Sequence, residues 1–266
     1  MMDKKQSVLY IDYLVAENIS NSLLFCGKIA AMTTAEVMKQ LEAMGSAQTR
    51  NIFINHGAPA DKLFGVKVGD MKSLLKPLKG KQDLALELYE TGNSDAMYLA
   101  ALVADGKKMS KEQLHHWAET ATWNMISEYS VPWVTAESPF ALELGLKWIN
   151  DAREHVASAG WTTLCCYLSM EADDNIDRTL MLELLTRVEK EISQTSNRVR
   201  YCMNSFVIGL GGYVRDLSNE AILTAKRIGK VSVNQGNTEC KVPDAAGYIQ
   251  KMIDRGPVKK KKTAKC

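Results

Sequence analysis

The sequence predicts an all-α protein built as a solenoid of stacked helix pairs, with a concave groove along one side. Apolar residues recur at helical spacing through most of the chain, which is typical of amphipathic helices. Helix pairs begin near residues 81, 110, 138, 176 and 219, and a unit of roughly 30 to 43 residues is typical of HEAT and armadillo repeats. Strand-like stretches are few, short and isolated. A globular bundle of helices is the alternative architecture.

Capping residues and glycines mark the expected helix boundaries. Gly92 follows an apolar helical face and suits the position just past a helix end. Ser110 and Gln113 have the spacing of a capping box at the start of the next helix. Pro139 follows Ser138 and suits the first position of a further helix. These signals predict short helices joined by short loops.

Three segments of the chain differ in character. Residues 1–31 are predicted to be an N-terminal extension, either an extra helix or the contribution of an upstream start codon. Acidic residues before its apolar stretch argue against a signal peptide. Residues 32–256 carry the helix-pair pattern and form the repeat domain. Residues 257–266 are lysine-rich and are expected to form a disordered tail that is solvated or attracts phosphate non-specifically.

Composition limits the possible classes of protein. The net charge is +2 and the tail lysines contribute five positive charges, which leaves the rest of the chain at −3. A non-specific DNA-binding protein is expected to be basic throughout, so any nucleic-acid surface must be a local patch. The six cysteines lack metal-ligand spacing, which predicts reduced thiols in a cytoplasmic protein. No apolar run has the length of a membrane span, and we expect neither a cofactor nor a membrane partner.

The tryptophans are concentrated in one stretch of the chain. They are Trp117, Trp123, Trp133, Trp148 and Trp161. Trp148 shares a helical stripe with small and apolar residues, which predicts a core position. Trp123 and Trp133 flank a polar run that a core does not need, so they mark the candidate functional face. His115 and His116 are adjacent on a helix and point in different directions, so we expect no metal site.

Two further segments have alternative interpretations. Glycines at 209, 211 and 212 lie inside an apolar helical run, which predicts a close contact between helices and argues against a phosphate-binding loop.

Trp123 and Ser127 share a helical face, and Arg198 and Arg200 follow later in the chain. An aromatic ring with arginines opposite suits a nucleotide lesion, because the ring contacts sugar or base and the arginines hold phosphate. Alternatively, the tryptophan only packs and the arginines only bind helix C-termini.

The helix pairs, the segment Trp-Asn-Met-Ile-Ser at 123–127 and the segment Asn-Arg-Val-Arg-Tyr-Cys-Met-Asn at 197–204 resemble the DNA alkylation repair family of the AlkD type. The resemblance covers roughly residues 32–255. Its members are HEAT-like alkylpurine DNA glycosylases, so the resemblance implies duplex DNA in the concave groove and a damaged base that is not extruded into a pocket. A catalytic Asp in this family stabilises the oxocarbenium-like sugar as the base leaves.

The resemblance also implies roles for individual residues. Trp123 matches the family's first Trp, and the catalytic Asp four residues later falls on Ser127, which carries no fixed charge. A shift of one residue would place Glu128 there, but a regular α-helix turns that carboxylate about 100° away from Trp123. These three residues are the catalytic candidates. The family's Arg falls near Ser158 and its second Trp near Asn204, so the resemblance predicts weak or absent base excision.

The loop at 230–244 is predicted to close one end of the groove, with Lys230 and Lys241 available for phosphate. The predicted DNA-binding residues are Trp123, Tyr129, Ser158, Trp161, Arg198, Arg200, Asn204, Lys230 and Lys241. The sequence therefore predicts a protein that binds duplex DNA, alkylated or not, in a concave groove. The alternative is a HEAT-like scaffold that binds a protein partner and no DNA.

Overall fold

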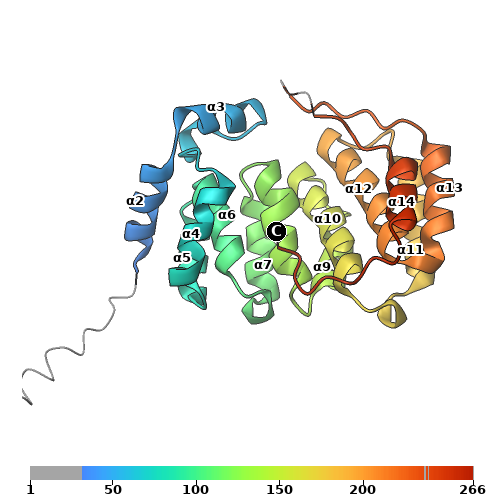
Figure 1. Cartoon of the computed structure of the whole chain (residues 1–266), viewed down its shortest axis with the longest axis horizontal. Helices are drawn as coiled ribbons and strands as arrows, with labels where there is room; N and C mark the ends of the chain where they lie inside the picture. The colour runs from blue at the N-terminus through green and yellow to red at the C-terminus, as the bar shows by residue number, and fades with distance from the viewer. Residues whose placement is uncertain (1–31, 237, 239, 266) are drawn as a thin grey trace, which may run out of the picture. The chain divides into compact units, whose positions relative to one another are not determined.

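The computed structural model of the protein describes residues 32–236, 238 and 240–265. This part of the chain contains thirteen α-helices and no strand (Figure 1). The predicted all-α class is therefore confirmed. The extra helix considered for residues 1–31 lies outside the described residues. Residues 34–266 form one compact unit.

The helices follow one another with short connections. The first six are α2 (Thr34–Met44), α3 (Ala47–Asn55), α4 (Val68–Leu78), α5 (Gln82–Glu90), α6 (Ser94–Val103) and α7 (Lys111–Thr120). A π-helix, η3 (Ile126–Ser130), leads into α8 (Val131–Ala136), α9 (Ala141–Trp148), α10 (Glu154–Met170), α11 (Arg178–Glu191), α12 (Asn197–Tyr213), α13 (Ser218–Ile228) and α14 (Ala245–Asp254). Helices pack mainly against near neighbours in sequence, such as α5 on α6, α9 on α10 and α12 on α13, as in a solenoid.

Local signals set several helix boundaries. Ser110 and Gln113 form the predicted capping box at the start of α7. Gly92 has a φ of 65° just after α5, a conformation that favours glycine. The helix expected from Pro139 begins instead at Ala141. The reason is that the Ser138 hydroxyl accepts a hydrogen bond from the Phe140 backbone N–H and holds a turn before the helix.

The core runs along the inner faces of the helices. Trp148 is fully buried, as predicted. The glycine run of α12 lies in close helix contacts, which confirms the prediction for that segment. A Cβ added at Gly211 would lie 2.7 Å from Ile249 of α14 and 2.9 Å from Ala221 of α13. Only the absence of a side chain at this position lets the last three helices approach one another.

The C-terminal segment differs from the disordered tail that we expected. Residues 257–265 lie along the ends of earlier helices, where Lys260 Nζ donates a hydrogen bond to the Leu168 carbonyl at 2.8 Å. Lys265 forms an ion pair with Glu137 at 3.3 Å. The physical reason is that helix C-termini present unpaired carbonyls and a partial negative charge, which bind lysine ammonium groups.

Candidate nucleic-acid interface

A cavity of about 520 Å³ lies between residues of α3 and described residues of the loop at 229–244. Figure 1 shows α3 at one end of the row of helices that carries the other lining residues. Side chains from five separate parts of the chain line it: α3, α6, residues 123–133, α12 and the loop. The lining residues are Ile52, Phe53, His56, Tyr98, Trp123, Asn124, Met125, Tyr129, Trp133, Arg198, Tyr201, Gln235, Cys240 and Lys241. We call this space the aromatic cavity.

The two tryptophans that flank the polar run both face the aromatic cavity. The ring of Trp123 lies 5.5 Å from that of Phe53. Trp133 contacts Tyr98 and Tyr129 edge-to-face, with ring centroids 5.5 Å and 5.8 Å away. Such pairs are worth about 0.5–1.5 kcal/mol beyond their buried area, so they stabilise the aromatic wall. Tyr129 is the most exposed of these rings, with 43% of it exposed.

Glu128 and Arg198 form a buried ion pair next to the aromatic cavity. The Arg198 Nε donates to Glu128 Oε1 at 2.7 Å, and Nη2 donates to Oε2. Arg198 Nη1 donates to Gln235 Oε1 at 2.9 Å, and the guanidinium lies 4.6 Å from the centre of the Tyr201 ring. Burial raises the pKa of the Glu128 carboxyl, and Arg198 only partly opposes that effect. Both carboxylate oxygens are therefore occupied by protein.

The π-helix η3 corrects the helical geometry assumed for Ser127 and Glu128. The Val131 N–H donates to the Ile126 carbonyl five residues earlier, which widens the turn. A rotation of 100° per residue therefore does not apply here, and Glu128 points to Arg198. Ser127 is buried, and its hydroxyl makes a long 3.4 Å contact with the Trp123 carbonyl. Ser127 does not line the aromatic cavity.

Arg200 and Asn204 hold the protein backbone. Arg200 donates to the carbonyls of Ile192, Thr195 and Ser232 at 3.0–3.1 Å. This is the alternative in which the arginine binds carbonyls near a helix C-terminus. The Asn204 side chain is buried, and its amide donates to the Pro243 carbonyl at 3.0 Å. We correct the prediction of direct DNA contact for both residues, because their polar groups position the loop at 229–244.

Ser158 and Trp161 are also corrected as DNA-contacting residues. Both are fully buried in α10. The Trp161 ring packs edge-to-face on Phe206 of α12, with centroids 5.2 Å apart. Neither side chain can reach a ligand without unpacking the core.

Described residues of the loop at 229–244 line one side of the aromatic cavity. That this loop closes the groove stays a prediction. Lys241 lines the cavity from this loop, whereas Lys230 is exposed away from the lining. Gly236, with a φ of 70°, lies against α3, because an added Cβ would be 2.7 Å from the Asn55 carbonyl oxygen. Nearby, Cys240 Sγ lies 3.9 Å from Nε2 of His56, the residue that follows α3 on the other side of the aromatic cavity.

That histidine, His56, was missed by sequence reasoning, as were Phe53, Tyr98 and Tyr201. Its hydrogen bond to the Ile52 carbonyl, followed by its contact with Cys240, raises the pKa of the imidazole. No local pattern connects residues 184 positions apart. Tyr201 could have been found, because it lies three residues after Arg198 on one helical face.

The other histidines serve the scaffold. His115 accepts a hydrogen bond from Trp148 Nε1 at 2.9 Å, and His116 pairs with Glu90 at 2.9 Å. Among the described residues, no group of three or more His, Cys, Asp and Glu side chains could hold a metal ion. None of the helices that the structure describes has the length and apolar character needed to cross a membrane.

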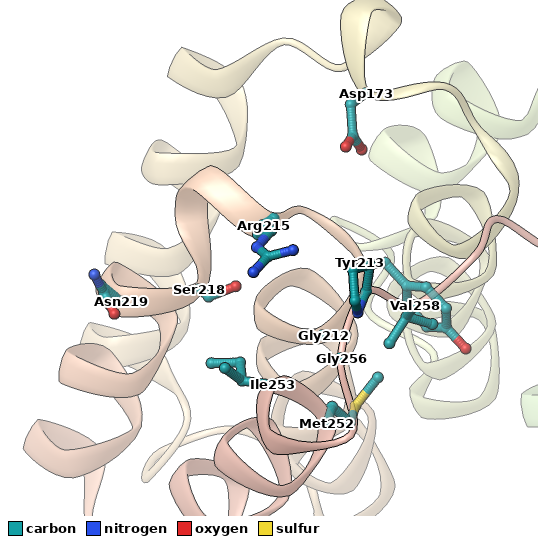
Figure 2. A pocket seen from close by; sticks show the side chains of 11 residues that line it. Asp173, Gly212, Tyr213, Arg215, Ser218, Asn219, Met252, Ile253, Gly256 and Val258 are labelled. Atoms are coloured by element: carbon teal, nitrogen blue, oxygen red, sulfur yellow. The ribbon is translucent and has the colours of Figure 1, made fainter.

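A second cavity of about 310 Å³ lies at the C-terminal end of the unit (Figure 2). Arg215, Tyr213 and Met252 line it, with Asp173 at its edge. It contains none of the predicted site residues. The aromatic cavity is therefore the candidate interface.

Comparisons with known proteins agree with this architecture. The family model described as DNA alkylation repair enzyme matches residues 37–249. The protein Lin0241 of Listeria innocua is 36% identical over 229 residues, covering 84% of this chain and 99% of that protein. Lmo0209 of Listeria monocytogenes is 35% identical over 230 residues, with the same coverage.

A solved structure gives the same fold. It is described as a new family of proteins related to the HEAT-like repeat DNA glycosylases with affinity for branched DNA structures. The TM-score is 0.80 at 36% identity, over 88% of this chain and 100% of that one. The predicted HEAT-like solenoid with a concave groove is thereby confirmed.

Proposed function

The chain belongs to the DNA alkylation repair enzyme family, and from this premise we propose that it binds DNA in its concave groove with little or no base-excision activity. We further propose that its preferred ligand is branched DNA, the ligand for which the solved relative has affinity. Duplex arms then lie along the groove, and the branch point lies at the aromatic cavity.

One observation carries the proposal of weak excision: Glu128, the carboxylate next to the position that the family resemblance implies for the catalytic Asp, is held by Arg198. A glycosylase of this kind needs a negative charge aimed at the developing oxocarbenium. Glu128 is 3% exposed, with both oxygens bonded to the guanidinium, so its charge is neutralised where it would be needed. Losing one preorganised electrostatic group typically lowers a rate by about 10²- to 10³-fold.

DNA binding is tested by fluorescence anisotropy with a three-way junction, a flap and a plain duplex of equal length. We expect tightest binding to the junction and a steep loss of affinity with salt. The log–log slope is about −0.9 for each phosphate contact on duplex DNA. Equal affinity for all three ligands would contradict the preference for branched DNA.

Excision is tested separately on duplex DNA that contains N7-methylguanine. We expect release of the base at a rate close to that of the DNA alone. Efficient release by the native protein that disappears in Glu128→Gln would identify Glu128 as the catalytic group and overturn the proposal of weak excision. Release that persists in Glu128→Gln would also overturn it and would place the catalytic group elsewhere.

The negative charge of the chain before its lysine-rich end favours a protein-binding scaffold as the second candidate function. The same anisotropy experiment discriminates the two. Absence of binding to every DNA at low salt, or binding that ignores salt, would favour the scaffold.

A further inference from the structure

We propose that the aromatic cavity receives one unstacked nucleobase of the DNA, while the adjacent phosphate lies at the edge of the cavity. This inference rests on the proposed function, because it identifies the part of the DNA that the protein recognises. It differs from the expectation, based on family resemblance, that no base is extruded into a pocket.

The first argument is the size and composition of the cavity. Its volume of about 520 Å³ falls within the range of about 300–1,000 Å³ for small-ligand pockets. Six Phe, Tyr and Trp rings line it: Phe53, Tyr98, Trp123, Tyr129, Trp133 and Tyr201. Nucleobases stack on aromatic side chains irrespective of sequence, because every base has a π-face.

The second argument is the exposure of apolar groups at this position. Tyr129 is 43% exposed, although its neighbours Glu128 and Ser130 on the π-helix are buried. Ile52 of α3, which lines the same cavity, is also exposed. Exposed apolar side chains that gather at one concave site are typical of a ligand-binding surface. A flat apolar group bound between the π-helix and α3 would cover the exposed side chains of Tyr129 and Ile52.

The third argument is the distribution of charge. Arg198 lies in the wall, where Glu128 neutralises its charge, so this part of the interior suits an uncharged base better than a phosphate. The Asn124 side chain has no hydrogen-bond partner among the described residues and offers both a donor and an acceptor to a base edge. Lys241 is exposed at the lining and is in no ion pair of the described chain, which suits a phosphate oxygen.

The fourth argument is access. The loop at 229–244 meets α3 beside the cavity, through Gly236 against Asn55 and Cys240 against His56. A base in a continuous duplex must leave its stack before it can enter such a site, at a cost of a few kcal/mol. A nucleotide at a branch point lacks a continuous stack on one side, so it leaves its stack at a lower cost. Occupancy of the cavity would therefore favour branched DNA over duplex.

The test compares a three-way junction that has a purine at the branch point with the same junction carrying an abasic site there. Stacking of one base is worth about 1–3 kcal/mol, which corresponds to about 5- to 150-fold in affinity. We expect the abasic junction to bind more weakly by a factor in this range. Tyr129→Ala should lose a similar factor on the intact junction and little more on the abasic one.

Tyr248→Ala is the matched control, because Tyr248 is 48% exposed on α14 and lies outside the cavity lining. It should leave both affinities unchanged. A second readout is the fluorescence of 2-aminopurine at the branch point, which native protein should quench and Tyr129→Ala should not.

Equal affinity of native protein for the two junctions, with unchanged 2-aminopurine fluorescence, would overturn the base-binding cavity and leave DNA binding intact. Independent, multiplying effects of the abasic site and Tyr129→Ala would also overturn it, because the ring and the base would then not be in contact. Failure to bind any DNA would overturn both this inference and the proposed function.

Discussion

Replacement of Arg198 by Met should strongly destabilise the protein and make its stability depend on pH. The variant leaves the Glu128 carboxylate buried without its partner, and the side chains of Glu128 and Arg198 are only 3% and 17% exposed. Removing one partner of a buried pair typically costs about 3–5 kcal/mol. For a unit of this size, 1 kcal/mol shifts the melting temperature by about 2–4 °C, so we expect a loss of about 6–20 °C.

The pH dependence has a definite sign. Burial already raises the pKa of Glu128 in the native protein, and loss of Arg198 should raise it further. A group whose pKa is raised on folding stabilises the protein when it is protonated, and this contribution is lost as pH rises through the folded-state pKa. The penalty of Arg198→Met should therefore be smaller at pH 5 than at pH 8.

Urea denaturation followed by circular dichroism at both pH values measures the effect. Arg227→Met is the matched control, because Arg227 pairs with Glu189 and Glu220 on the surface. Exposed pairs contribute little, so its midpoint should stay close to that of native protein. An Arg198→Met variant that is no less stable than this control, or whose penalty grows as pH falls, would refute the reasoning.

Three further predictions concern stability. Arg153 holds the pKa of Asp151 at about 2, well below its ordinary 3.8. Native protein should therefore be more stable than Asp151→Asn above pH 3.8, and this advantage should disappear as the pH falls toward about 2. Urea denaturation across this pH range measures the difference, and an advantage that grows on acidification would contradict the prediction. Deletion of residues 257–266 should lower the melting temperature in a thermal scan, because it removes lysines from helix C-termini, and an unchanged value would indicate a free tail. Gly211→Ala should cost about 1–3 kcal/mol by overpacking, whereas Gly69→Ala, with open space around the added Cβ, should not destabilise the protein in the same denaturation assay.

The local patterns of the sequence determined the helical class and several of its details. Ser110 and Gln113 cap a helix through contacts within four residues, and Gly92 ends one by its own backbone conformation. Trp148 is buried because it lies on an apolar helical stripe. Each of these features depends on residues close together in sequence, so spacing alone is informative. The concentration of tryptophans also located the segment that lines the aromatic cavity.

Only the tertiary structure decided which of these residues meet. Trp161 and Trp123 look alike in sequence, yet Trp161 packs into the core while Trp123 lines a cavity. Glu128 finds its partner 70 residues away, and the π-helix that orients it changes a rotation that the sequence pattern assumed to be regular.

The arginines and the chain end show the same division. Arg198 and Arg200 are two positions apart on one helix, so one faces the aromatic cavity and the other binds backbone carbonyls. The lysines of the last residues have the composition of a disordered tail, but carbonyls at the ends of distant helices bind them. Composition and periodicity report what a residue prefers locally. Its partner depends on which distant helix end or loop the fold brings within hydrogen-bonding distance, and that information is absent from any short stretch of the sequence.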